Sequence, residues 1–415
     1  IEAGTGLRQT NLLRAILSSR VGGAVVGLGF DRIDTNGSPE LGSFARNFVW
    51  LNLAYQLPGQ VWGQLEWRNT TSDRESLPTP KRRDWILRLR RTFGDAWYAD
   101  IIAGSGRQEI DTLASGVADD SLRKPIVGEA HQLAVRAARS AERWRTQLTV
   151  RAWDGDDVPQ LETEGSLEVE VGPASLYGSG QFAKWEAFTL AAGYGALRLR
   201  LPLGVRLFAE LEEGDRGLFG ARPVAWHEFS RRTAGLELQL WSWTLMGRAG
   251  SWKVLPSPAL GVPFDSASGL AGGTVDVAEA SARGPLAKLF GGQLSVGGWY
   301  RWHEVGPFYY WPQTWWRLEG LYHVLALSDQ LEIWLSVLGG VRGSTSVPDL
   351  TGGAELGVAS GNLNWLRGEA VVRIRDIHIF YNYEYFDLVT GEAGVRDFVL
   401  PQVRTHFGVK WEFWN

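Results

Sequence analysis

The side chains best suited to chemistry are six histidines and a large charged set, because the 415 residues include no cysteine. The absence of cysteine excludes disulfides, thiolate metal ligands and a cysteine nucleophile. No two histidines have the HExxH spacing of a zinc site, and the chain has no GxSxG, Walker A or strand-to-helix GxGxxG motif. We therefore expect no enzyme activity, no cofactor and no resident metal ion. The histidines are His131, His227, His303, His323, His378 and His406.

Two further features of the sequence could support chemistry, a Ser/His pair and an acidic run. A Ser/His hydrolase acting on lipid needs its histidine at the lipid-facing surface, whereas alternation along the expected strands places most histidines on the opposite face. The run Asp154-Gly-Asp-Asp157 offers hard oxygen ligands for Ca²⁺. Nothing else in that segment completes a ligand set, so a solvated acidic loop is the favoured interpretation.

Charged side chains are the remaining candidates for function, because they recur at every second position of apolar segments. In a barrel these positions would line the lumen. Facing rows of opposite charge would select permeants by charge and size; alternatively, the same residues would pair into networks that brace the wall. The predicted pore-lining residues are Arg88, Arg90, Arg145, Arg151, Arg206, Glu210, Arg317, Glu319, Glu332, Glu369, Arg373, Glu384 and Arg404.

Many short strands are needed to position these residues, and the sequence has the two-residue period of strands. In the segment VWGQLEWR at 61–68, apolar residues or glycine alternate with mostly polar ones. The alternation recurs at 144–151 and 403–413. The faces predicted to point outward, such as Leu331, Ile333, Leu335 and Val337, carry almost no charge. In lipid such rows need no cover, provided that all backbone groups pair and no sheet edge remains.

Short turns and longer connections alternate along the chain, which is typical of outer-membrane barrels with short periplasmic turns and long extracellular loops. One opening strand at 15–32, nine hairpins and a final strand predict about 20 strands, within a range of 18 to 22. The short turns are expected at 57–60, 94–96, 140–143, 172–173, 201–204, 241–243, 284–292, 327–330 and 375–376. The long connections are expected at 69–83, 105–128, 154–164, 213–230, 251–273, 303–313, 342–362 and 387–401.

Composition agrees with an all-β transmembrane antiparallel barrel. The mean hydropathy is −0.14, and no run of 18 apolar residues could form a transmembrane helix. The net charge of −4 gives no reason to expect a nucleic-acid partner. Many of the 21 tryptophans fall near predicted strand ends, where an aromatic girdle would lie. We expect residues 1–14 to be an N-terminal periplasmic segment and residues 15–415 to be the barrel.

The C-terminal segment 405–415, THFGVKWEFWN, resembles the final strand of bacterial outer-membrane proteins. The resemblance implies a place in the Gram-negative outer membrane, contact with its lipids, and recognition by the barrel-assembly machinery through Phe413 and Trp414. The stretch 379–386, with Leu400 and Pro401, resembles the last hairpin of TonB-dependent receptor barrels. Because no plug domain is expected ahead of the barrel, ligand-gated active uptake is not implied.

Two functions follow from a wide barrel, which is a water channel when empty and a sheath when occupied. The first is passive diffusion of small hydrophilic solutes or ions through a porin-like channel. The second is a scaffold or conduit that encloses a partner chain, such as a plug, an exported polymer or a multihaem cytochrome, or that binds a periplasmic protein. An inward-folded loop at 105–128 or 251–273 would favour the channel.

Overall fold

The computed structural model describes most of the chain, and all structural statements below refer to these residues. The described ranges are 1–6, 10–36, 43–74, 79–94, 96–111, 126–155, 158–186, 188–217, 226–256, 273–304, 312–328, 330–347, 358–360, 362–388 and 403–412. None of the helical segments in these ranges is long and apolar enough to cross a membrane.

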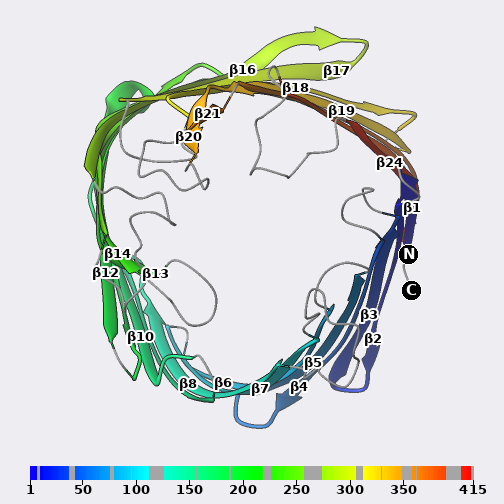
Figure 1. Cartoon of the computed structure of the whole chain (residues 1–415), viewed down its shortest axis with the longest axis vertical. Helices are drawn as coiled ribbons and strands as arrows, with labels where there is room; N and C mark the ends of the chain where they lie inside the picture. Colours follow the sequence, from blue (N-terminus) through cyan, green and yellow to red (C-terminus); the bar gives the residue numbers. More distant parts are fainter. Residues whose placement is uncertain are drawn as a thin grey trace. The chain divides into compact units, whose positions relative to one another are not determined.

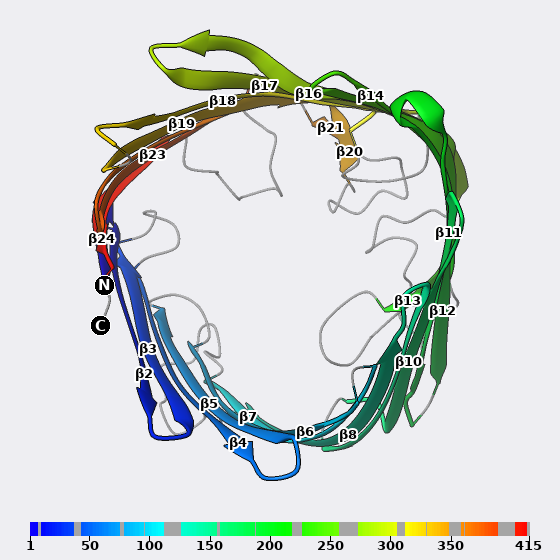
Figure 2. The ribbon, with the colours of Figure 1, turned by 180° about the vertical axis from the view of Figure 1, so that it is seen from behind.

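The described chain is all-β and folds as a closed antiparallel barrel. Its main sheet has 22 strands, and a separate sheet has two. Consecutive strands pair antiparallel, β19 pairs with β22, and β1 pairs with both β2 and β24. Figures 1 and 2 show β24 beside β1. The predicted fold class and the range of 18 to 22 strands are confirmed.

Contacts divide the chain into two units, which are described separately. The first comprises Ile1–Ser166, Gln181–Thr189 and His406–Asn415; the second comprises Leu167–Gly180 and Leu190–Thr405. The first unit contains β1 (Glu2–Gly6), β2 (Thr10–Val21), β3 (Ala24–Thr35), β4 (Phe44–Leu57), β5 (Val61–Arg74), β6 (Thr79–Phe93), β7 (Trp97–Asp111), β8 (Ile126–Ser140) and β9 (Trp144–Gly155). The second contains β13 (Val205–Gly217), β14 (Trp226–Leu240), β15 (Trp243–Pro256), β16 (Gly273–Leu289), β17 (Gly292–His303), β18 (Thr314–Ala326), β19 (Leu331–Arg342), β20 (Thr345–Val347), β21 (Val358–Ser360), β22 (Leu363–Ile374) and β23 (Ile377–Leu388). The unit boundaries pass through or beside β10 (Leu161–Val171), β11 (Ala174–Lys184), β12 (Thr189–Arg200) and β24 (Val403–Trp411).

The count of 22 exceeds the predicted 20 because the start of the chain holds three strands. The single strand expected at 15–32 is divided by a turn at Gly22 and Gly23, which separates β2 from β3. Residues 1–14, expected ahead of the barrel, hold β1 and the start of β2, and both strands pair within the sheet.

Short turns join the strands at the predicted positions. The turn at 58–60 contains Gly59 with φ of +75°, a left-handed conformation that glycine adopts without a steric cost. The hairpin expected within 284–292 turns at Phe290 and Gly291, between β16 and β17. The two-residue turns at 241–242, 290–291 and 375–376 explain why consecutive strands pair as hairpins.

The strands extend farther than predicted at the opposite ends. β5 continues to Arg74 and β6 begins at Thr79, although 69–83 was expected as a loop. Extension lets backbone groups at the rim of the sheet pair with their neighbours. The central parts of the expected connections 105–128 and 251–273 lie outside the described residues.

The two faces of the sheet differ as the alternation predicts. In the first unit, Leu65, Leu87 and Ala103 are register partners on one face. Gln64 and Arg88 are partners on the other. In the second unit, Leu207 and Leu236 share the apolar face, and Leu335, 43% exposed, lies on the apolar face of β19. We call the apolar face the outer face and the charged face the inner face.

Candidate functional site: the charged inner face

The predicted pore-lining residues lie in the main strands, and most of those with a described side chain have an ion-pair partner. The structure pairs two of them directly, Glu332 and Arg373. The other ion-paired ones have partners that were not in the predicted set: Arg88 and Arg90 with Asp100, Arg151 with Glu162, Arg206 with Glu237, Glu210 with Arg248, Glu319 with Arg283, and Glu384 with Arg367. Arg145, Glu369 and Arg404 lie in β9, β22 and β24; the side chain of Arg404 is outside the described part. The inner face is therefore cross-linked by ion pairs between neighbouring strands.

The centre of this network in the first unit is Asp100 on β7, whose side chain is fully buried. Arg88 and Arg90 approach it from β6 and Arg136 from β8. Arg88 Nη2 donates to Asp100 Oδ2 at 2.7 Å, and Arg90 Nε donates to Oδ1 at 2.7 Å. Arg136 Nε donates to Oδ2 at 2.7 Å. One buried carboxylate thus holds three guanidinium groups, which leaves an excess of two positive charges.

Aromatic side chains pack against these guanidinium groups. The guanidinium carbon of Arg90 lies 4.3 Å from the centre of the Tyr98 ring, and that of Arg136 lies 5.7 Å from it. Arg88 lies 5.9 Å from the Trp62 ring centre. A ring face attracts a cation, so the rings hold the arginines in place without neutralising them.

A second cluster, in the second unit, surrounds Glu332 on β19. Arg373 Nη2 on β22 lies 2.6 Å from Glu332 Oε2, and His323 Nε2 on β18 lies 2.8 Å from Oε1. The His323 ring stacks on Trp334, with ring centres 5.4 Å apart. These contacts place His323 on the inner face, where alternation predicts most of the histidines. The contact with Glu332 and the stacking on Trp334 give this histidine a structural role.

A third cluster joins β13, β14, β15 and β16 of the second unit. Arg248 Nε donates to Glu279 Oε2 at 2.6 Å, and Arg248 Nη1 lies 3.9 Å from Glu210 Oε2. Thr233 Oγ1 donates to the same Glu210 oxygen at 3.5 Å. Glu279 is only 5% exposed, so its charge is balanced within the wall.

Tryptophans and arginines form a mixed surface on β15, β17 and β18. The guanidinium carbon of Arg301 lies within 6.0 Å of three ring centres, those of Trp252, Trp299 and Trp315. Arg317 lies 5.5 Å from the Trp299 ring. Trp299 and Trp315 meet edge to face at 5.5 Å. This surface can contact solutes through both cations and ring faces.

Sequence reasoning missed Asp100, Arg136, Arg248 and Glu279, although alternation carried a signal for them. Asp100 follows Tyr98 by two residues, so both lie on one face of β7. Arg136 lies between the outward residues Val135 and Ala137. Among the described residues, no group of three or more His, Asp or Glu side chains could hold a metal ion.

The assembly signal predicted at the C-terminus is described only in part. Phe413 and Trp414 lie outside the described residues. The preceding strand, β24, pairs with β1 from Glu2↔Lys410 to Gly6↔His406. The Trp411 backbone N–H donates to the carbonyl of Ile1 at 2.6 Å. The predicted final strand is therefore present.

Comparisons with known proteins identify the fold and no family. Neither protein-family models nor curated proteins match the chain. Among solved structures, a mutant of the ferric enterobactin receptor PfeA from Pseudomonas aeruginosa matches with a TM-score of 0.73 and 9% identity, over 99% of this chain and 80% of that one. The FrpB iron transporter from Neisseria meningitidis matches with 0.68 and 10%, over 99% and 80%. The copper transporter OprC matches with 0.66 and 10%, over 99% and 79%. The likeness confirms the predicted outer-membrane type of β-barrel.

Proposed function

We propose that the chain is an outer-membrane transport barrel through which small hydrophilic solutes or ions diffuse passively. The observation that carries the proposal is the contrast between its faces: charged side chains occupy the inner face and apolar ones the outer face. A charged wall holds water and lowers the barrier for polar solutes. The similar structures named as iron and copper transporters are consistent with a transport role, and nothing in the proposal requires an enzyme activity.

The Asp100 cluster gives the proposed channel a preference for anions. Its guanidinium groups are 22–32% exposed while the carboxylate between them is buried. A permeating anion would therefore meet the positive groups and not the negative one. Positive charge on a wall raises the local concentration of anions.

Strand number favours a second candidate, a barrel whose lumen encloses another protein. Barrels of 16–18 strands leave an aqueous channel, whereas 22-stranded outer-membrane transporters have a plugged lumen. This chain has 22 strands in the main sheet among its described residues. A partner would then supply the occupant, and the charged inner face would be its polar interface.

Conductance of the purified barrel separates the two candidates. Protein extracted in mild detergent would be analysed for stoichiometric partner chains and then inserted into planar lipid bilayers. Stepwise conductance from the single chain, with chloride preferred over potassium, is the result expected of a channel. A barrel that always carries a second chain and conducts only after its removal would overturn passive diffusion and support the enclosing role.

A further inference from the structure

The outer face of β13 to β17 contains a hollow that the transport function does not use. Its cavity volume is about 880 Å³. Ala209, Ala234, Ala249 and Ala278 form one register row across four strands and make its floor. Leu211 on one side and Trp302 on the other belong to its lining. Larger side chains thus flank a floor of methyl groups on the face that meets lipid.

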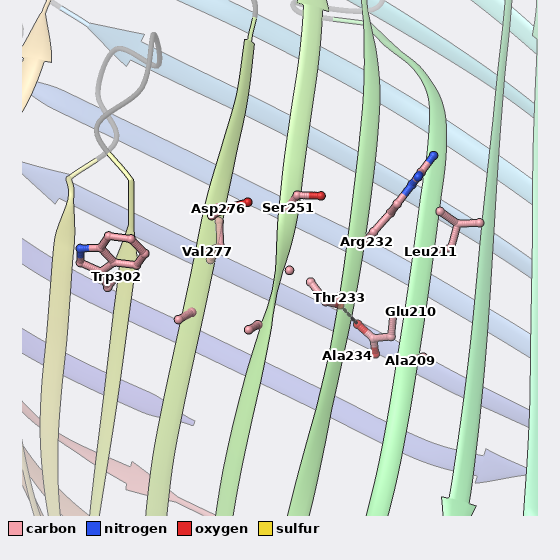
Figure 3. A pocket seen from close by; sticks show the side chains of 13 residues that line it. Ala209, Glu210, Leu211, Arg232, Thr233, Ala234, Ser251, Asp276, Val277 and Trp302 are labelled. Carbon is pink, nitrogen blue, oxygen red and sulfur yellow. Dashed lines mark hydrogen bonds between the residues drawn. The ribbon is translucent and has the colours of Figure 1, made fainter.

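A second register row, mostly polar, borders the hollow at one end. It lies two residues along each strand from the alanines and consists of Leu211, Arg232, Ser251 and Asp276 (Figure 3). We call it the polar row. Between the short turns and this polar row lie the row of Leu207 and Leu236 and the row of the four alanines. The polar row therefore marks the end of the apolar band that is farther from the short turns. Lipid headgroups lie at that level. Because the short turns are predicted to face the periplasm, the row lies in the outer leaflet.

The charges in this row and the next fit a headgroup that has both a phosphate and hydroxyl groups. Arg232 is exposed, and among the described residues neither Arg232 nor Lys253 has an ion-pair partner. Lys253 lies two residues beyond Ser251 on the same face of β15. Guanidinium and ammonium groups bind phosphate. Ser251 and Asp276 can accept hydrogen bonds from sugar hydroxyls, and Asp276 lies two strands from Arg232, about 10 Å at the usual strand spacing.

The same face also carries acidic residues. Glu213 is in the row of Lys253, and Glu228 lies beyond it. The two cations therefore lie in adjacent rows at the level of a lipid phosphate, and acidic groups in the same rows and beyond them can accept hydrogen bonds from sugar hydroxyls. A lipid with phosphate alone would leave Ser251 and Asp276 without donors.

From this arrangement we infer that the hollow binds a phosphorylated glycolipid of the outer leaflet. An acyl chain lies on the alanine floor between Leu211 and Trp302. The phosphate contacts Arg232 and Lys253, and sugar hydroxyls donate to Ser251 and Asp276.

The test uses the full chain in detergent, titrated with bisphosphorylated lipid A and, separately, with phosphatidic acid, whose headgroup is a phosphate without a sugar or glycerol, and analysed by native mass spectrometry. We expect the wild-type barrel to retain one lipid A molecule at concentrations at which phosphatidic acid is lost. The double variant Arg232→Gln, Lys253→Gln should retain it at least fivefold less. Ala249→Leu, which fills the floor without changing charge, should have a similar effect.

Arg83→Gln is the matched control, because Arg83 is an exposed cation on the outer face of β6 without an alanine floor. It should leave retention unchanged. Heat-modifiable mobility on gels checks that each variant is folded. Equal loss in the control, unchanged retention in both hollow variants, or equal retention of phosphatidic acid would overturn the proposal.

Discussion

Arg90 and Asp100 are register partners on β6 and β7, and the guanidinium Nε of Arg90 lies 2.7 Å from the carboxylate Oδ1 of Asp100. The contact is asymmetric, because the Asp100 side chain is 0% exposed and that of Arg90 is 32% exposed. Asp100 is therefore an anchor inside the wall, while Arg90 presents its charge to the inner face.

Substitution of Asp100 should weaken the contacts between β6, β7 and β8 and leave three guanidinium groups without their shared carboxylate. Asp100→Asn should reduce the free energy of unfolding by about 2 kcal/mol, since hydrogen bonds to charged groups contribute about 1.5–3 kcal/mol. Urea unfolding in lipid vesicles measures the change. The control is Asp84→Asn, which removes the partner of the exposed Arg82 and should cost less than about 1 kcal/mol. Equal losses of unfolding free energy in the two variants would show that the burial of Asp100 adds nothing to stability.

Alternation makes a prediction about lipid contact. Leu335→Arg should destabilise the barrel by about 2–4 kcal/mol, because Leu335 lies near the middle of β19 on the outer face. The adjacent change Ser336→Arg should cost much less, because Ser336 is the register partner of Glu369 on the inner face. Both variants would be compared by urea unfolding in vesicles. Similar costs would contradict the assignment of faces.

The absence of cysteine allows the topology to be mapped with single introduced thiols. Cysteine in place of Asp73 or Glu304, both near the long-connection ends of their strands, should react with a membrane-impermeant maleimide on intact cells. Cysteine in place of Trp241 or Phe290, which are 95% and 98% exposed in short turns, should react only after the outer membrane is permeabilised. The reverse labelling pattern would invert the orientation.

Arg317 is the best position to test charge selectivity without disturbing the wall. It stacks near Trp299, and among the described residues it has no ion-pair partner. Arg317→Glu should therefore shift the reversal potential of the conducting barrel toward cation preference while leaving stability within about 1 kcal/mol of the wild type. Arg317→Gln should give an intermediate shift. An unchanged reversal potential in both variants would exclude Arg317 from the permeation path.

The fold could be predicted from sequence because its main constraint is local. A strand with one face in lipid must be apolar at every second residue, and this pattern is present in 61–68 and 144–151. The turn at Gly22-Gly23 was missed although a Gly-Gly pair between apolar segments is a hairpin signal. Both flanking segments are rich in small and apolar residues, so they read as one continuous strand.

The ion pairs could not be predicted to the same extent, because they depend on register between strands. Sliding one strand by a single residue moves all its side chains to the other face. The inner position of Arg90 follows from alternation within β6, and the turn expected at 94–96, where the structure has it, sets the alignment that pairs Arg90 with Asp100. Arg136 approaches Asp100 from β8, and the long connection between β7 and β8 does not fix the alignment of those two strands.

Closure of the sheet by β1 and β24 has a consequence for how the protein is made. The backbone contact between Ile1 and Trp411 spans a sequence separation of 410 residues. Such non-local pairing is slow, because the entropy of bringing distant segments together must be lost before any contact compensates for it. Until synthesis reaches the last strand, β1 has an open edge that could pair with a strand of another molecule. We therefore expect the nascent chain to depend on a chaperone that covers this edge during its passage to the membrane, and truncation before β24 should cause aggregation instead of a smaller barrel.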